Sequence, residues 1–243
     1  MNANFLPTHG AHYGEFAVAR STMEYWWLNW SNLWQRRLMQ WRVGSARVNK
    51  RAFDIVASLL FLIVFSPLYL LLAVLVKLDG GPAIFSQTRV GRHGEEFQMY
   101  KFRSMCPDAE ARLAKLLSQN EHAEGVTFKM KKDPRVTRIG KWIRRFSLDE
   151  LPQFINVLKG DMSLVGPRPP TPREVLRYSQ GDRRRLAVKP GLTCFWQVSG
   201  RSNIDFAGQE KLDVQYIEQA CFWVDVKLVF KTVSAVVNGH GAC

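Results

Sequence analysis

The chain has 243 residues, of which 47% are hydrophobic and 23% charged, a composition typical of a folded protein that excludes wholesale disorder. A net charge of +13 favours anionic partners such as nucleic acid, phosphorylated metabolites or acidic lipid headgroups. The four cysteines lie far apart without a CxxC pair. We therefore expect neither a disulfide framework nor a zinc cluster, and a reducing compartment.

The first predicted region, residues 1–48, combines a loose tail with a tryptophan-rich helix. It holds five of the eight tryptophans, at positions 26, 27, 30, 34 and 41. Their spacing places most of them on one helical face, and nearby arginines can meet lipid headgroups. The pattern predicts an amphipathic helix at a membrane interface. A helix that packs on the protein's own core is the alternative, and both interpretations stay open.

The second region, residues 49–78, contains an apolar run from Ile55 to Val76. As a helix it would reach roughly 33 Å, about the hydrocarbon thickness of a bilayer. Lysines and arginines flank both ends, and basic residues tend to stay on the cytoplasmic side. Pro67 breaks the helical hydrogen bonding in mid-run, and the hydroxyl of Ser66 can bond the freed backbone. These features predict a re-entrant helix-break-helix hairpin. A kinked spanning helix and a buried core helix are the alternatives.

The third region, residues 79–243, has the pattern of a mixed α+β domain. Ala83 to Val90 and Phe97 to Arg103 are rich in β-forming residues around a short turn, which predicts a hairpin. Residues 107–119 have the pattern of an amphipathic helix with acids in its first turn. Residues 129–145 carry eight basic residues against one acid, which is either a solvated face or a phosphate-binding surface. Residues 222–237 predict either an interfacial or a core helix.

The most informative segment runs from Ser147 to Gly160 and predicts a short helix that Gly160 ends. Asp149 is the expected N-cap, and Ser147 with Glu150 has the spacing of a capping box. The two acids are either helix caps or a functional pair. A helix N-terminus keeps a carboxylate ionised and attracts phosphate, so a nucleophile beside a metal ligand at this place would suit phosphoryl transfer.

Several motifs together resemble the bacterial sugar transferases, the monotopic phosphoglycosyl transferases that begin exopolysaccharide, O-antigen or glycoprotein glycan assembly. The resemblance covers about residues 49–243. It rests on KRAFD (50–54), Ser66-Pro67, YKFRSM (100–105), RRFSLDELPQFINVLKGDMSLVGPRP (144–169), KPGLT (189–193) and QVSGR (197–201).

The resemblance implies a two-step transfer of a sugar 1-phosphate from a nucleotide diphosphate sugar to polyprenyl phosphate, with Mg²⁺. Asp149 would attack the sugar-bearing phosphorus, and Glu150 would bind the metal. The phosphate-binding candidates by the same matching are Arg144, Lys101, Arg168 and Arg201. Ser66 and Pro67 match the membrane break, and Arg51 and Asp54 would lie at the mouth of the hairpin.

The resemblance implies three partners: a UDP-sugar, polyprenyl phosphate and the cytoplasmic face of a bacterial inner membrane with its anionic phospholipid. The QVSGR motif resembles that of relatives that use UDP-glucose or UDP-galactose. A homo-oligomer stays open. A nucleic-acid binder is disfavoured because no RNP, helix-turn-helix or zinc signature is present. The remaining alternatives are a glycosyltransferase that moves the sugar without its phosphate and a non-catalytic scaffold of a glycan assembly system.

Overall fold

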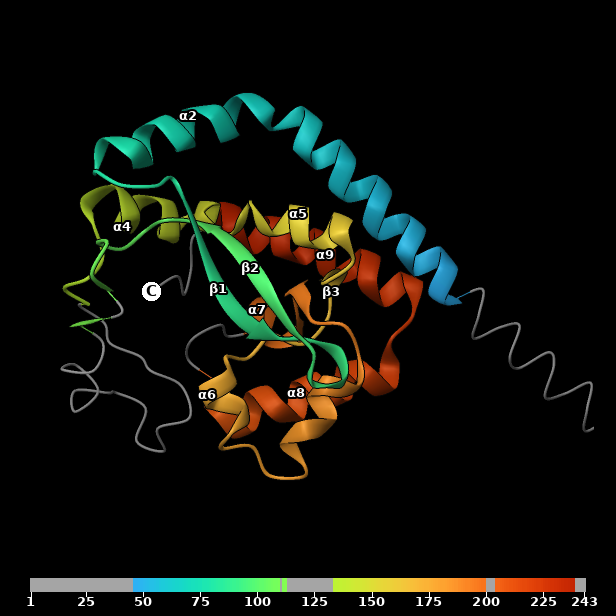
Figure 1. Ribbon diagram of the computed structural model, residues 1–243. Coiled ribbons are helices and arrows are strands. Elements are labelled where there is room, and N and C mark those ends of the chain that lie inside the picture. Colours follow the sequence, from blue (N-terminus) through green and yellow to red (C-terminus); the bar gives the residue numbers. More distant parts are fainter. Residues whose placement is uncertain (1–45, 110, 113–132, 200–203, 239–243) are drawn as a thin grey trace, which may run out of the picture. The chain divides into compact units, whose positions relative to one another are not determined.

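The computed structural model describes residues 46–109, 111–112, 133–199 and 204–238, which belong to one compact unit beginning at Ala46 (Figure 1). Its elements are, in chain order, the helix Ala46–Val64, α2 (Ser66–Leu78), β1 (Ile84–Val90), η1 (Arg92–Gly94), β2 (Glu96–Phe102), α4 (Arg138–Arg145), η3 (Leu148–Glu150), α5 (Gln153–Lys159), β3 (Ser163–Val165), α6 (Pro172–Val175), η4 (Asp182–Ala187), β4 (Gly191–Thr193), α7 (Phe195–Ser199), α8 (Phe206–Gln219) and α9 (Phe222–Asn238). Helices around two small sheets confirm the α+β class.

Some of the predicted features lie outside the described residues. These are the tryptophan-rich helix up to residue 45, nearly all of the helix predicted over 107–119, the first four residues of the basic run, and Arg201.

The predicted hairpin is confirmed almost to the residue. β1 and β2 pair antiparallel with Ile84 opposite Phe102 and Val90 opposite Glu96, joined by the turn η1. The second sheet is smaller, because β3 and β4 pair in parallel through three residues each. Lys101 is the penultimate residue of β2 and is partly buried.

The apolar run forms two helices, Ala46–Val64 and α2, that meet at a bend of 65° (Figure 1). Pro67 has no N–H to donate to the carbonyl of Ile63 one turn earlier. The Ser66 hydroxyl donates to that carbonyl instead, at 2.9 Å. The predicted break is thus confirmed, together with its hydrogen-bond replacement. Among the described residues, no single helix meets the length and hydropathy of a membrane span, whereas this bent pair does when taken together.

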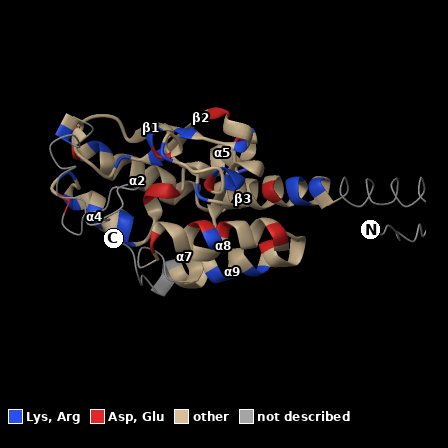
Figure 2. Cartoon of the chain, turned by 90° about the horizontal axis from the view of Figure 1, so that it is seen from below, with Lys and Arg blue, Asp and Glu red and all other residues tan. Residues whose placement is uncertain are grey.

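The bent pair has one face against the rest of the unit and one face outward. Leu72 and Val76 are fully buried. The outward face holds apolar side chains that are each more than half exposed, namely Val56, Leu60, Ile63, Val64, Leu70, Leu71, Val74 and Leu78. In Figure 2 the charged residues of the helix Ala46–Val64 gather at its beginning and tan residues follow. The interpretation as a fully buried core helix is therefore wrong.

Three polar residues of the KRAFD motif fasten the first helix to the globular part. Lys50 Nζ lies 2.5 Å from Asp225 Oδ2 in α9. Arg51 donates to the carbonyls of Val157 and Leu158 at 2.6 and 2.7 Å, and so caps the C-terminal end of α5. Asp54 is buried and accepts hydrogen bonds from the start of β3. Arg51 and Asp54, which the resemblance implies at the mouth of the hairpin, thus contact α5 and the start of β3.

The second helix of the pair is fastened next to the two acids of the Ser147–Gly160 segment. Leu72 and Val76 join Phe102 of β2 and Ile143 of α4 in one apolar cluster. The Tyr69 hydroxyl donates to the carbonyl of Leu151, directly after Glu150. Hence α2, β2 and the acidic segment form one packed layer.

The last helix, α9, has a mixed environment. Leu228 is buried in the larger core cluster, whereas Trp223 and Phe230 are 75% and 71% exposed. Core packing is therefore part of its role, and its other face presents large apolar side chains outward. The described cysteines 106, 194 and 221 are free thiols, as expected from their spacing.

Candidate active site

The acidic segment begins where the chain reverses after α4. Phe146 caps that helix, and Ser147 adopts a left-handed conformation with φ of 53°. Such a conformation is uncommon for a residue with a side chain and costs of the order of 1 kcal/mol. It sends Leu148–Glu150 into a single 3₁₀ turn, which places both acids beside β2.

The expected helix capping is wrong in its details. Asp149 is not an N-cap but the middle residue of the 3₁₀ turn, and α5 begins after Pro152. Ser147 makes no side-chain capping bond, so its predicted capping box with Glu150 is absent from the described structure. Gly160 does end α5, with φ of 94°. The two carboxylates therefore do not cap a helix. Of the two alternatives, helix caps or a functional pair, the second is favoured.

A buried asparagine holds the acidic segment against the hairpin. Asn156 in α5 accepts a hydrogen bond from Tyr100 N at 3.0 Å and donates to the carbonyl of Gln98 at 2.7 Å. These bonds use the free edge of β2. The sequence analysis missed Asn156, although a fully buried amide in the middle of an apolar helix is a detectable signal.

Lys101 and Glu150 form the central ion pair of the site. Lys101 Nζ lies 2.7 Å from Glu150 Oε1, and both side chains are about one-quarter exposed. Asp149 is only 8% exposed and makes no ion pair with any described residue. One carboxylate of the pair is thus engaged by a cation, while its neighbour forms no ion pair with a described residue.

The electrostatic environment pushes the two acids in opposite directions. Burial raises the pKa of Asp149 to about 6, although the charges of Lys101 and Arg144 act against this rise. Burial also acts to raise the pKa of Glu150, but Lys101, Arg168 and Arg89 outweigh it and lower that pKa below its ordinary value. At pH 7 both carboxylates are ionised, and Asp149 is the more basic of the two.

Three of the four predicted phosphate-binding residues act on this pair of acids. Lys101 contacts Glu150 directly, Arg144 reaches Asp149 through its charge from the last turn of α4, and Arg168 acts on Glu150 through its charge. Arg201 lies outside the described residues. The structure adds Arg89 of β1, a buried arginine among the basic residues that follow the apolar run.

The site has one carboxylate that suits a divalent cation. Glu150 Oε2 makes no hydrogen bond or ion pair within the described part of the chain. No cluster of three or more metal-ligating side chains occurs among the described residues. Mg²⁺ is commonly held by one or two carboxylates together with substrate phosphates. The donor set therefore fits a magnesium ion that arrives with a phosphorylated substrate.

A separate groove of about 610 Å³ lies at the far end of the hairpin. It is lined by apolar residues around Val90, Pro172 and Leu176, with His93 and Arg183 at its margin. Neither acid of the pair lines it. We therefore place the candidate active site at the acids and not in this groove.

Comparison with known proteins decides the family. The model of the family described as "Bacterial sugar transferase" matches residues 45–239. The chain belongs to the bacterial sugar transferase family. Among its relatives, the galactosyl transferase CpsE of Streptococcus agalactiae serotype III is 51% identical over 199 residues, which are 82% of this chain and 44% of that protein.

Two further members of the sugar transferase family are similar to most of this chain. The undecaprenyl-phosphate galactose phosphotransferase of Salmonella typhimurium is 47% identical, over 82% of this chain and 42% of its own length. The exopolysaccharide production protein ExoY of Rhizobium meliloti is 40% identical, over 79% of this chain and 87% of its own. The chain thus spans less than half of the first two relatives and most of the third.

Proposed function

We propose that this sugar transferase moves a hexose 1-phosphate from a UDP-hexose, UDP-glucose or UDP-galactose, to polyprenyl phosphate and releases UMP. Relatives named for undecaprenyl-phosphate galactose and glucose phosphotransfer support this reaction class. The product would be the first lipid-linked sugar of an exopolysaccharide or a related glycan, in keeping with relatives named for exopolysaccharide production.

The reaction proceeds in two displacements at one phosphorus atom. An oxygen of Asp149 attacks the sugar-bearing phosphorus of the UDP-hexose, and the bond to the bridging oxygen breaks, so that UMP leaves with the electron pair. An oxygen of the polyprenyl phosphate then attacks the same phosphorus. Asp149 leaves as a carboxylate, and the product is a polyprenyl diphosphate hexose.

Lys101, Arg144 and Arg168 reduce the repulsion between two polyanionic substrates and the carboxylates. Glu150 is the residue that would hold Mg²⁺, which supplies charge neutralisation at the transferring phosphoryl group. Lys101 is placed to keep Glu150 ionised, and Glu150 thereby stays available as an oxygen ligand.

The observation that carries this proposal is the pair of adjacent acids in different states. Asp149 is buried, forms no ion pair with a described residue and is the more basic acid, whereas Glu150 is paired with Lys101 and has a lowered pKa. A carboxylate with little competition for its lone pairs is the better nucleophile, and a firmly ionised one is the better metal ligand.

The proposal is tested with purified protein, Mg²⁺, polyprenyl phosphate and a panel of UDP-sugars, with UMP as the readout. We expect UMP with UDP-glucose or UDP-galactose, and a phosphosugar adduct on Asp149 when the lipid is withheld. The exposed Asp79→Asn variant is the matched control for Asp149→Asn.

Two other results would replace this function. Release of UDP would indicate a glycosyltransferase that moves the sugar alone. An unchanged readout in Asp149→Asn would exclude the covalent route, and no turnover by folded protein with any sugar of the panel would favour a scaffold.

We propose that the bent helix pair enters and leaves the cytoplasmic face of the inner membrane as a re-entrant hairpin. Its exposed apolar face, the 65° bend and the hydrogen bond from Ser66 to Ile63 support this placement, because a freed carbonyl is costly in hydrocarbon. The basic residues at both ends would meet anionic phospholipid.

Labelling from one side of the membrane separates a re-entrant hairpin from a span. Val48→Cys and Leu78→Cys lie at the two ends of the pair, and both residues are more than 60% exposed. In inside-out vesicles, with the native exposed cysteines replaced, an impermeant thiol reagent should modify both positions. Modification of only one would identify a spanning helix.

A further inference from the structure

The loop 167–170, which carries Arg168 between prolines, is fixed through its carbonyl groups. Each of its three proline carbonyls accepts one hydrogen bond: Pro167 from Gly191 N at 2.9 Å, Pro169 from Arg89 Nη1 at 3.0 Å, and Pro170 from Val90 N at 2.9 Å. Two of the three donors belong to β1. The backbone of Arg168 is therefore held against the hairpin, and only its side chain is left to be oriented.

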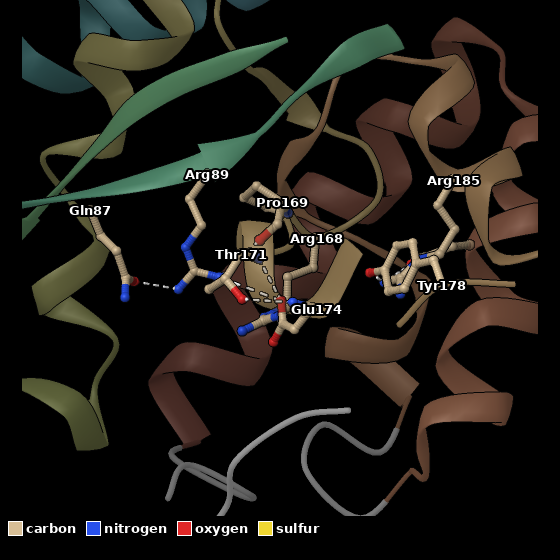
Figure 3. Close-up of polar contacts among 9 residues, drawn as sticks. Gln87, Arg89, Arg168, Pro169, Thr171, Glu174, Tyr178 and Arg185 are labelled. Carbon is tan, nitrogen blue, oxygen red and sulfur yellow. Dashed lines mark hydrogen bonds and ion pairs between the residues drawn. The ribbon is translucent and has the colours of Figure 1, made fainter. Parts of the chain in front are cut away.

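Glu174 is the acid that orients this side chain. Its carboxylate accepts a hydrogen bond from Thr171 N at 2.6 Å, and Glu174 N donates to the Thr171 hydroxyl at 3.3 Å, so the two residues form a capping box at the start of α6. Both carboxylate oxygens of Glu174 lie 3.4 Å from Arg168 Nη1 (Figure 3). Glu174 is thus fixed itself and is able to fix Arg168.

Arg89 is the second arginine near this carboxylate. Its Nη1 lies 4.0 Å from Glu174 Oε2, and its Nη2 donates to Gln87 Oε1 at 2.7 Å (Figure 3). Arg89 and Glu174 are both less than 10% exposed, whereas the side chain of Arg168 is 31% exposed. One buried negative charge therefore faces two arginines, and only the outer one reaches solvent.

This sharing keeps Arg168 available. The contacts of 3.4 Å are long for a charged hydrogen bond, and Arg89 neutralises part of the charge of Glu174. Glu174 consequently orients the Arg168 guanidinium without fully neutralising its positive charge. Arg89 lies on β1, whose partner strand β2 carries the Lys101 that contacts Glu150, and the charges of Arg89 and Arg168 both act on Glu150.

We propose that Glu174 and Arg89 are positioning residues that hold the Arg168 guanidinium toward the phosphates of the bound UDP-hexose. Neither residue touches the substrate. The inference rests on the proposed function for the identity of the ligand, but the network itself is defined by the contacts above.

A binding cycle with Glu174→Gln, Arg168→Ala and the double variant tests this role. Glutamine suits the third helical position of a capping box, so the helix start is retained while the charge is lost. We expect the Kd for UDP-galactose or UDP-glucose to rise about fivefold in Glu174→Gln, the size expected for a partly exposed ion pair. The kcat should stay within about twofold.

The double variant gives the decisive comparison. If Glu174 acts through Arg168, its Kd equals that of Arg168→Ala within about twofold, because the group to be positioned is already missing. Multiplication of the two single effects, or an unchanged Kd in Glu174→Gln, would overturn the inference. Glu210→Gln, which removes a carboxylate 3.8 Å from the exposed Arg184, is the matched control and should leave Kd unchanged.

Two further measurements keep the outcomes separate. If Glu174→Gln does not fold, Glu174→Asp takes its place, because aspartate keeps the charge but withdraws it from Arg168 by one methylene. Tight binding of a UDP-hexose without UMP release would defeat the proposed reaction and leave the cycle in Kd intact. Failure of folded wild-type protein to bind UDP-galactose, UDP-glucose or UMP would overturn both proposals.

Discussion

Two buried aspartates of this chain share a pKa but not an environment. Burial raises the pKa of Asp149 to about 6, and it does the same for Asp213 in α8. Asp213 is fully buried and lies 2.5 Å from Arg185 Nη2, in a closed pair. Asp149 keeps a small exposed fraction and has no cation in contact among the described residues.

The comparison shows that a perturbed pKa does not by itself identify a catalytic residue. Asp213 is ionised in order to satisfy Arg185, whose own pKa is raised by this carboxylate against the effect of burial. Asp149 forms no ion pair with a described residue, and the charges of Lys101 and Arg144 only partly offset the effect of burial on its pKa. A buried carboxylate that forms no ion pair and lies next to solvent and to an acid able to bind a metal is a candidate catalytic residue. A carboxylate that completes a buried ion pair has a structural role.

The largest expected effect is that of Asp149→Asn. Turnover should fall by at least about 10³-fold, because the nucleophile is lost, and the single-turnover adduct should disappear. Its folded-state pKa exceeds the ordinary value of 3.8, so the stability that this carboxyl contributes is present below pH 4 and lost as the pH rises through 6. The variant should therefore gain about 1 to 3 kcal/mol at pH 8 by denaturant unfolding.

Asp213→Asn should show the opposite pattern. Loss of this carboxylate leaves Arg185 buried without its partner, which costs about 3 to 5 kcal/mol in the free energy of unfolding. The fraction that folds should still form the Asp149 adduct. A stable but inactive Asp213→Asn protein would show that the two aspartates do not have separate roles.

A smaller effect is expected on the pH dependence of kcat/KM. Since Asp149 reacts as a carboxylate, kcat/KM should rise about tenfold per pH unit below about pH 6 and level off above it. Lys101→Met removes a charge that lowers this pKa, so the rising limb should move to higher pH. Lys159→Met, at an exposed lysine of α5, should leave the limb in place.

The smallest effect is expected for Tyr69→Phe, which asks how firmly the turn at Asp149 is held. The variant removes the hydroxyl that donates to the Leu151 carbonyl, at a cost of about 0.5 to 1.5 kcal/mol in unfolding free energy. Tyr100→Phe, whose hydroxyl accepts a hydrogen bond from Lys159 at 3.3 Å, provides the control. An equal free energy of unfolding in both variants would mean that the hydrogen bond to Leu151 does not stabilise the turn.

Local features of this fold are predictable from the sequence. The hairpin and the break at Ser66-Pro67 depend on residues close together in the chain, and both occur within a residue of their predicted places. The acids at 149 and 150 are identified by the family resemblance. Their geometry is not, because the left-handed Ser147 depends on the packing of Leu148 and Leu151 against α2.

The long-range parts of the candidate site lie beyond sequence reasoning. Arg89 contacts Glu174, and Lys50 contacts Asp225, although the partners lie far apart in the sequence. No spacing rule connects such pairs. A charged residue within a β-forming run is the only local signal for Arg89. The basic character of the chain predicts phosphate binding as a class, but it does not say which cations gather around the acids.

The apolar helix pair also completes both hydrophobic clusters of the unit. Phe61 stacks on Phe154 of α5 with ring centroids 4.1 Å apart, while Leu72 and Val76 fill the space beneath α2. Removal of the chain up to Leu78 would delete these side chains and expose the apolar surface of the layer that carries Asp149. Deleting the helix pair would remove Leu72 and Val76 from the smaller cluster and Phe61 from the larger one, so the proposed membrane hairpin is also part of the hydrophobic core.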